Sequence, residues 1–563
     1  MAKARKSKVQ VLPQAARKDL EAILGARFVE TDPAVMTGYS WYCGNGEVPG
    51  RDKFTAHFPI AIVLPSTTEE VAEIVKACLR HKLHFKAHST GYGSMAVVPA
   101  PNTVAIDLRR MNTLEIVPKD RMAIIGPYAT AGMIQAEALN HGLTCHIVGA
   151  GPSHSPLASA TSLFGVGVTG LSTGVNMRNL LAWEWVSPTG EIIRGGAAEG
   201  DKGWFAGEGP GPGSRGLIRG LFGAAGGLGV FTKIGIKLYP VANKGQLQHA
   251  GQHPQLGTKV PELSKLYQIV WPDWDSQTKA TFELMQDDLC FAMLRMPPNS
   301  LAWTVTSSNT QFVEQDREGT IAPVADPMND KNWTVLISSR SPEEHAWRQS
   351  CIEDIVTRTG ARFIELAQED EWMLYHNLVT AQYIARVLRP AGGIMTSFGV
   401  FDSFHFLPRA MEMGEKAQRG QNKPGGHLTT GQGEEQWVWP NEGRYMWSEN
   451  IYQFDPASEA SRAAATHGFL AHVADAWREG STGMVTFTVG PMQEVMGERV
   501  GRAHHQIRKI KNHFDPGDNS KSKEYVIPKV HPVLEKILPP LRPLLSSEPV
   551  LKFASKGVAK NGL

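Results

Sequence analysis

Residues 149–170 read GAGPSHSPLASATSLFGVGVTG, and this stretch decides which fold the rest of the chain has to fit. Glycine permits positive φ angles and lets the backbone approach a ligand closely. Dense glycine returns in GEGPGPGSRG (207–216) and in GAAGGLGVF (223–231). We therefore expect the chain between residues 149 and 230 to wrap around a ligand.

Two GxGxxG sequences lie in this region, at Gly165–Gly170 and Gly211–Gly216. A dinucleotide fingerprint requires a strand before the glycines, a helix after them and an acidic residue about 20 positions further on. The first match leads into the polar run Leu171–Asn176, and the second follows glycine and proline rather than a strand. The chain also lacks GxxxxGK[ST], so neither a Rossmann site nor a P-loop is predicted.

Strands and helices alternate around the glycine-rich region. Ile60–Leu64 is a short apolar strand, and Thr68–His81 has apolar residues at helical spacing behind a Thr-Glu-Glu start. The other elements expected in this half are strands at His84–Lys86, Thr103–Asp107, Met122–Ile125 and Val230–Leu238, a helix at Thr130–His141, and a hairpin of Trp183–Ser187 with Glu191–Ile193.

Residues 242–500 are richer in tryptophan and acidic residues and carry longer helices. Ser341–Thr359 is predicted as a helix, because Ser341 can cap it and proline follows at the first helical position. Ala457–Glu479 is a second helix, with apolar residues at helical spacing. Val500–Phe514 is a basic amphipathic helix, which Asp515-Pro516-Gly517 is expected to end.

The tail beyond Ser520 contains eight Lys and Arg against three Glu, a net charge of +5. Its leucines have helical spacing, but we expect prolines at 539, 540 and 543 to interrupt that helix. We expect an arm packed across the protein or another subunit. The alternatives are docking on a partner or peripheral contact with an anionic membrane face.

Composition narrows the class of protein further. The chain has 563 residues, 42% hydrophobic and 20% charged, with a net charge of +2, which is typical of a soluble protein of two large domains and not of a general nucleic-acid binder. No apolar run is long enough to span a membrane, and no secretory signal follows the basic start. Five scattered cysteines without CxxC argue against a disulfide framework, a zinc ribbon or an iron–sulfur cluster in this chain. We expect a cytoplasmic protein.

Residues about 55–240 resemble the flavin-binding domain shared by vanillyl-alcohol oxidase, p-cresol methylhydroxylase and the D-lactate and glycolate dehydrogenases. The order and spacing of several short segments carry the resemblance, and a last segment matches the closing helix and Asp-Pro turn of that family. The segments are PSTTEEVAEIVKACLRH (65–81), KAHSTGYGSM (86–95), GAGPSHSPLASATSLFGVGVTG (149–170), WEWVSPTGEII (183–193), LFGAAGGLGVFTKIGIKLYP (221–240) and IRKIKNHFDPGDNS (507–520).

The resemblance implies an α+β fold in which a two-subdomain FAD-binding domain of the p-cresol methylhydroxylase (PCMH) type is covered by a cap or substrate domain of antiparallel sheet and flanking helices. The expected divisions are an N-terminal arm (1–54), the FAD-binding domain (55–241), the cap domain (242–499), a segment returning to the FAD domain (500–535) and a basic leucine- and proline-rich tail (536–563).

The resemblance also implies FAD, whose pyrophosphate needs converging backbone N–H donors. A non-covalent flavin is expected, because Thr90 aligns with the histidine to which some family members bond their flavin. The usual three glycines of the first loop are Ala87, His88 and Ser89, which predicts a stiffer or differently placed loop. The residues that the resemblance assigns to FAD are Lys86, His88, Ser89, Thr90, Gly91, Tyr92, Ser153, Ser159, Thr161, Ser162, Gly165, Gly167, Gly229, Val230 and Asn519.

Catalysis requires residues that orient the substrate and accept its hydroxyl proton. The metal-dependent 2-hydroxy-acid dehydrogenases of this family carry GHxGDGNxH, which is absent here. Aligned on Tyr452–Pro456, the two histidines of that motif fall near Glu442 and Glu449. These carboxylates are either ligands of a divalent metal, a base, or ordinary solvated side chains.

Other candidates lie in the same domain. His405 or His427 could be a base, and Arg444 with Tyr445 is suited to gripping a carboxylate or phenolate. The aromatic residues around them form either a substrate wall or plain packing. These residues are Trp437, Trp439, Tyr445 and Trp447.

The function implied by the resemblance is that of an FAD-dependent dehydrogenase acting on a small-molecule alcohol, first of all a 2-hydroxy acid. The alternatives are a phenolic or other alcohol oxidase or dehydrogenase, non-redox use of the flavin, and a flavin electron-relay subunit of a larger complex. Electrons would pass to a separate iron–sulfur protein or electron-transfer flavoprotein, to oxygen or to a quinone. An oligomer is expected, and no nucleic-acid partner.

Overall fold

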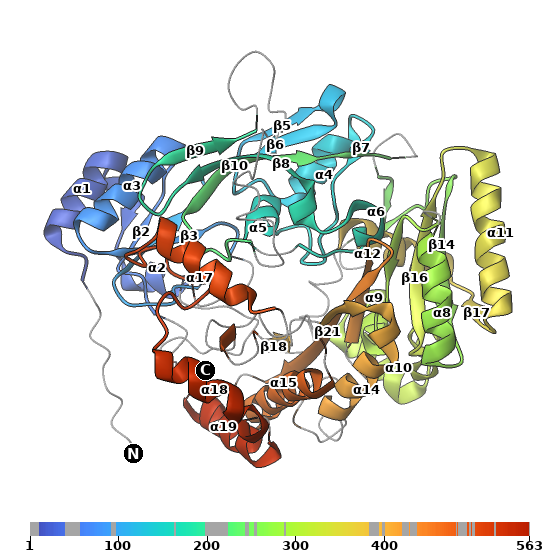
Figure 1. The fold of residues 1–563 in the computed structure, drawn as a ribbon. Coiled ribbons are helices and arrows are strands. Elements are labelled where there is room, and N and C mark those ends of the chain that lie inside the picture. Colours follow the sequence, from blue (N-terminus) through green and yellow to red (C-terminus); the bar gives the residue numbers. More distant parts are fainter. Residues whose placement is uncertain are drawn as a thin grey trace.

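The computed structural model shows two domains and a C-terminal segment that returns to the first of them (Figure 1). The structure describes residues 11–39, 57–91, 97–162, 165–196, 223–241, 247–252, 256–286, 289–381, 393–396, 400–418, 427, 436–455, 457–479, 481, 493–494, 497, 501–522, 525–545 and 547–561. Tyr92 and the second GxGxxG match at 211–216 lie outside the described residues. Among the described helices, none has the length and apolar character needed to cross a bilayer.

The first subdomain is a mostly parallel sheet packed on the helix α3 (Thr68–Arg80). Thr67 caps this helix by accepting a hydrogen bond from the backbone N–H of Glu70 at 3.1 Å, and its apolar side is buried against the sheet. The strand order is β1 (Val29–Glu30), β2 (Ala61–Val63), β4 (Thr103–Asp107) and β3 (His84–His88). The helix and the three strands expected between residues 60 and 107 are confirmed.

The described part of the segment expected as an N-terminal arm (1–54) packs on this subdomain. Helix α1 (Gln14–Leu24) buries Ala16 and Leu20 in the same core as Val71 and Val75 of α3, and β1 pairs with β2. A short helix, α2 (Pro33–Thr37), follows. The apolar residues of α1 recur at i and i+4, and a helix with such a stripe is stable only when a neighbour covers it.

The second subdomain is an antiparallel sheet of five strands. Ser187–Gly190 forms the expected turn between two of them, with Gly190 at φ +83°. The strand order is β5 (Leu114–Val117), β6 (Met122–Ile125), β10 (Val230–Lys237), β8 (Leu180–Val186) and β9 (Ile192–Gly195). The elements around it are α4 (Ala131–Leu139), α5 (Pro156–Thr161), α6 (Gly170–Thr173) and the strand pair β7 (Leu143–Thr144) and β11 (Tyr239–Pro240).

The antiparallel strands of the cap domain form one extended sheet. Its strands β17 (Arg362–Ile364), β14 (Ser264–Val270), β16 (Asn332–Ser338) and β15 (Ala292–Leu294) form a sheet in that order. Backbone hydrogen bonds of 2.9 and 3.2 Å between Arg295 and Val438 extend it to the hairpin of β20 (Gln436–Asn441) and β21 (Tyr445–Phe454). β21 also pairs with β18 (Gly393–Thr396) and β19 (Val400–Ser403).

Alternating side chains give this sheet two different faces. Leu266, Leu294 and Leu336 share a buried cluster with Ile147 and Val168 of the first domain, whereas the intervening residues pack under helices on the other side. We call these the inner and the outer face. The helices over the outer face are α8 (Trp274–Met285), α11 (Pro342–Arg358) and α14 (Leu407–Gln418). The remaining helices and strands of the cap are α9 (Pro298–Val305), α10 (Asn309–Glu318), α12 (Gln368–Thr380), α15 (Glu459–Glu479), β12 (His249–Ala250) and β13 (Gly257–Thr258).

The chain returns to the first domain through α17 (Ala503–Phe514), which Figure 1 shows beside β2 and β3. After the Asp515 turn, residues 519–521 run parallel to β3: Phe85 N–H donates to Asn519 O at 2.9 Å, and Lys521 N–H donates to Phe85 O at 3.0 Å. The chain at residues 519–521 therefore extends the sheet of the first subdomain beside β3.

The C-terminal arm consists of α18 (Pro532–Leu545) and α19 (Glu548–Asn561), and α19 packs on the cap helix α15 (Figure 1). His467 of α15 contacts Glu548 at 3.0 Å, and Leu551 is buried. The expected interruption by prolines is wrong, because α18 continues through all three of them. Proline fixes φ near the helical value, but inside a helix it removes a backbone hydrogen bond and its ring crowds the carbonyl four residues earlier, so α18 forms at a local cost.

Candidate flavin site

The first segment of the candidate site follows directly from β3, which ends at His88. The backbone N–H groups of Ser89, Thr90 and Gly91 donate no hydrogen bond to another described residue. Gly91 has φ +76°, and a Cβ there would lie 3.2 Å from the His88 ring. The loop thus presents three consecutive unused donors, which is the arrangement that binds an anion.

His88 is held behind this loop. Its ring lies 4.8 Å from that of Tyr39, and its Nδ1 atom is buried without a hydrogen-bond partner among the described residues. Burial lowers the pKa of His88, so the ring is neutral near pH 7. A buried nitrogen without a partner costs free energy, which a bound group would recover.

The second segment is folded tightly against itself. Val148 forms a bridge with Gly167, and Gly149 N–H donates to Val166 O at 2.9 Å. A Cβ at residue 167 would overlap the carbonyl of Ile147, so only glycine fits there. The GVGVTG run is therefore a packing motif rather than a Rossmann turn.

His146, which was not predicted from the sequence, links Gly165 of this segment to Thr173 of α6. Its Nδ1 lies 2.6 Å from Thr173 Oγ1, and its Nε2 lies 2.8 Å from Gly165 O. Burial lowers the pKa of His146 to about 4, so the neutral ring donates through Nε2 and accepts at Nδ1. A lone histidine in a short apolar stretch of sequence gives no signal of such a role.

Most hydroxyls assigned to FAD in the second segment already have protein partners. Ser159 Oγ accepts from Asn176 Nδ2 at 2.7 Å, and Thr161 Oγ1 donates to Leu157 O at 2.9 Å. The carbonyls of Thr161 and Ser162 accept from Ala224 and Ala225, which joins the second segment to the third. Ser153 alone is exposed in its loop.

The third segment, residues 223–230, is joined to the returning chain. Gly229 N–H donates to Ser520 Oγ at 3.0 Å, and Lys511 Nζ donates to Gly227 O at 2.8 Å and Ser520 O at 2.7 Å. Lys86, which is 1% exposed, extends its ammonium to within 3.4 Å of Gly226 O. Two buried ammonium groups therefore contact consecutive carbonyls of one glycine turn.

Asn519 is oriented by the turn that contains it. Its backbone N–H and its Nδ2 both donate to Asp515 Oδ1, at 2.8 and 3.3 Å. The carbonyl of Asn519 accepts a hydrogen bond from the backbone N–H of Phe85, so Asn519 lies beside β3, the strand that leads into the first loop. Hydrogen bonds thus join the first segment to the returning turn, and the third segment to the first, to the second and to that turn.

The inner face of the β20–β21 hairpin points toward the FAD-binding domain. Trp437, Trp439 and Trp447 are no more than 2% exposed and pack in the cluster that contains Ile147. Tyr445 packs against the same cluster, and Glu449 lies on the same face, opposite Trp437, with Trp447 Nε1 3.5 Å from Glu449 Oε2. The three tryptophans fit the interpretation of these aromatic residues as packing. Tyr445 and Glu449 are only half-buried.

The other catalytic candidates are not gathered with Tyr445. His405 is exposed and its ring lies 4.5 Å from Phe282 of α8, on the outer face, while His427 is exposed in a loop. Arg444 is exposed at the hairpin turn.

The two glutamates proposed as metal ligands are also apart. Glu442 lies in the turn and pairs with Arg178 at 2.6 Å, whereas Glu449 lies four residues beyond Tyr445, roughly 13 Å along the strand. Within the described residues, no three His, Cys, Asp or Glu side chains are grouped closely enough to hold a metal ion.

Residues 59–196 match a family model described as an FAD binding domain. This match identifies an FAD binding domain in that part of the chain. Among solved structures, p-cresol methylhydroxylase with substrate bound has a TM-score of 0.71 at 18% identity, covering 92% of this chain and 98% of that one. A 4-ethylphenol oxidase from Gulosibacter chungangensis has a TM-score of 0.68 at 18% identity, covering 92% and 97%.

The matches to curated relatives each cover about a third of this chain. An uncharacterized FAD-linked oxidoreductase of Mycobacterium tuberculosis is 30% identical over 186 residues, which is 32% of this chain and 38% of the relative. The D-lactate dehydrogenase of Archaeoglobus fulgidus is 28% identical over 187 residues, 32% and 38% of the two chains. The 4-cresol dehydrogenase flavoprotein subunit of Pseudomonas putida is 31% identical over 197 residues, 33% and 36%. The match therefore covers well under two thirds of each relative.

Proposed function

We propose that this protein is an FAD-dependent oxidoreductase that takes a hydride from the hydroxyl-bearing or activated carbon of an aromatic alcohol or alkylphenol. The aromatic inner face of the β20–β21 hairpin supports this substrate class, because Tyr445 and Glu449 stand at its edge toward the FAD-binding domain. Names of proteins with a similar fold or sequence, p-cresol methylhydroxylase and 4-cresol dehydrogenase, agree with it.

The residues present fit FAD. Ser89, Thr90 and Gly91 would hold the pyrophosphate with backbone N–H groups, and Lys86 would offset its charge. When bound, FAD supplies the two-electron acceptor for the hydride. Thr90 in place of a histidine supports non-covalent binding.

Residues of the β20–β21 hairpin would donate and accept protons during the reaction. Burial, with Glu442 nearby, raises the pKa of Tyr445 to about 12, so Tyr445 keeps its proton at neutral pH and can donate a hydrogen bond to the substrate oxygen. Glu449, roughly 13 Å from Tyr445 along the strand, would act at the opposite end of the substrate and accept a hydroxyl proton there as the C–H bond breaks. The three tryptophans would keep bulk water from this side of the substrate.

The test is to add a candidate substrate to the purified protein without oxygen and to monitor reduction of the flavin as a loss of its absorbance. We expect 4-hydroxybenzyl alcohol or 4-ethylphenol to bleach the flavin, and acid precipitation to release it into the supernatant. Glu449→Gln should slow bleaching about 100-fold or more, in line with the loss of a general base, while leaving FAD content unchanged. Glu459→Gln, an exposed change on α15, is the matched control. Rapid bleaching by the Glu449→Gln protein would remove Glu449 from the mechanism.

A 2-hydroxy acid is the second candidate, supported by the D-lactate dehydrogenase relative. It requires a group that grips a carboxylate, and Arg444 at the hairpin turn is the candidate. Bleaching by D-lactate or glycolate, abolished in Arg444→Gln, would favour this class over the aromatic one. EDTA sensitivity of the reaction would restore a metal role for Glu442 or Glu449.

The electron acceptor is proposed to be a separate protein. The Pseudomonas putida relative is named as a flavoprotein subunit, which supports a partner of that kind. If reduced protein instead reoxidises in air within its turnover time, oxygen is the acceptor and no partner is needed.

A further inference from the structure

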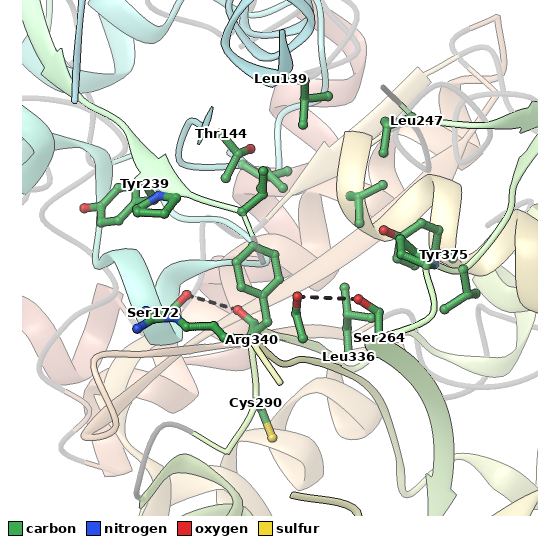
Figure 2. A pocket seen from close by; sticks show the side chains of 18 of the residues that line it. Leu139, Thr144, Ser172, Tyr239, Leu247, Ser264, Cys290, Leu336, Arg340 and Tyr375 are labelled. Atoms are coloured by element: carbon green, nitrogen blue, oxygen red, sulfur yellow. Dashed lines mark hydrogen bonds between the residues drawn. The ribbon is translucent and has the colours of Figure 1, made fainter. Parts of the chain in front are cut away.

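A cavity lies on the seam between the two domains. It has a volume of about 700 Å³, the size of a small-molecule site. Thr144 and Tyr239 of the FAD-binding domain lie on one side and Leu247 and Tyr375 of the cap on the other (Figure 2). No described residue of the first loop, of 149–167, of 223–230 or of the returning turn lines it.

Apolar and polar side chains share the wall of the cavity. Its walls include Ile147, Phe291, Leu336 and Val379, which come from both domains. The hydroxyl of Ser172 is already bonded to Phe291 O at 3.0 Å, and that of Ser264 to Ser338 at 3.4 Å (Figure 2). The apolar part of the wall suits an apolar body, and the polar groups that are already bonded leave fewer partners for a sugar or a nucleotide.

The rim of the cavity carries excess positive charge. Arg348 is paired with Glu344 at 2.8 Å, so these two charges cancel. Arg340 and Lys259 are exposed on the rim, the Lys259 ammonium lies 5.7 Å from the centre of the Trp372 ring, and Glu262 is the opposing acid. The remaining rim charge is two positive against one negative, which favours an anionic head group.

We propose that this cavity binds an amphiphilic monoanion, an alkyl or aryl carboxylate whose apolar body fills the interior and whose carboxylate meets Arg340. Arg340 precedes the helix α11, and its backbone N–H donates to Glu344 at 2.8 Å, which fixes the base of the side chain. The planar guanidinium matches a carboxylate with two parallel hydrogen bonds. This site is independent of the proposed redox function.

The test is calorimetric titration of the FAD-loaded full chain with octanoate and with its neutral counterpart octanamide. Octanoate should bind at one site per chain, and octanamide about tenfold more weakly, the difference that one charged hydrogen-bond pair makes. Because no described flavin-site residue lines the cavity, the visible flavin spectrum should not change during the titration. Equal affinity for the amide, or a spectral change with each addition, would overturn the assignment.

Variants locate the site. Arg340→Gln should reduce octanoate affinity about tenfold, while Arg317→Gln, an exposed change of equal charge on α10 outside the cavity, should leave it unchanged. Ser338→Phe fills the cavity and should abolish binding; should that variant not fold, Lys259→Gln combined with Arg340→Gln replaces it. Unchanged affinity in Arg340→Gln would place the carboxylate elsewhere and refute the proposal.

Discussion

At the scale of single residues, Lys511 holds the returning chain on the FAD-binding domain. Its ammonium is 1% exposed and contacts Asp515 Oδ2 at 2.6 Å as well as the carbonyls of Gly227 and Ser520. Removing the charge leaves Asp515 buried without its cation, which costs about 3–5 kcal/mol for a buried pair. We expect Lys511→Met to weaken FAD binding at least tenfold and to lower the free energy of unfolding, measured by flavin fluorescence and urea titration. Lys509→Met, an exposed change on the same helix, should do neither; wild-type FAD affinity in Lys511→Met would contradict this coupling.

At the scale of elements, much of the structure follows from local pattern. The helix at 68–80 and the strands at 103–107 and 122–125 are fixed by spacing, capping and apolar runs that neighbouring residues carry. The integration of α1 and the continuity of α18 were not predictable in this way, because burial of α1 depends on α3 and a proline-bearing helix depends on what supports it. The candidate site divides similarly. The glycine-rich segments predict the flavin-binding loops from local sequence. His146 and Lys511 could not be predicted in this way, because their hydrogen-bond partners lie 19 and 284 residues away.

The helix caps give a prediction at this same scale. Thr67 caps α3 in the first domain, and Ser341 caps α11 in the cap, with hydrogen bonds of 3.1 and 3.2 Å. We expect Thr67→Ala and Ser341→Ala each to lower the free energy of unfolding by about 1 kcal/mol, measured by chemical denaturation. Flavin release should move to lower denaturant in Thr67→Ala only, because α3 supports the sheet that ends in the first loop. If Ser341→Ala releases flavin equally early, the two domains unfold as one unit.

At the scale of the whole molecule, the two domains together bury histidines that must stay neutral. Burial lowers the pKa values of His146, His154 and His472 to about 4, from 6.5 in an exposed chain. The unfolded chain therefore binds more protons, so stability is complete above pH 6.5 and is lost as the pH falls from 6.5 toward 4. We expect the free energy of unfolding, from urea titrations at pH 7, 6 and 5, to fall by up to about 1.4 kcal/mol per pH unit for each histidine.

Replacing one of these histidines isolates its share of the effect. His146→Asn should be less stable than the wild type at pH 7, because contacts to Thr173 and Gly165 are lost, yet its stability should depend less steeply on pH by about one proton. His141→Asn, at an exposed position of the same domain, should leave the slope unchanged. Since His146 ties β7 to the GVGVTG segment, the acid-sensitive step would also loosen the flavin cradle, and flavin should be released over the same pH range. A wild-type slope in His146→Asn would mean that His146 already takes up its proton in the folded protein.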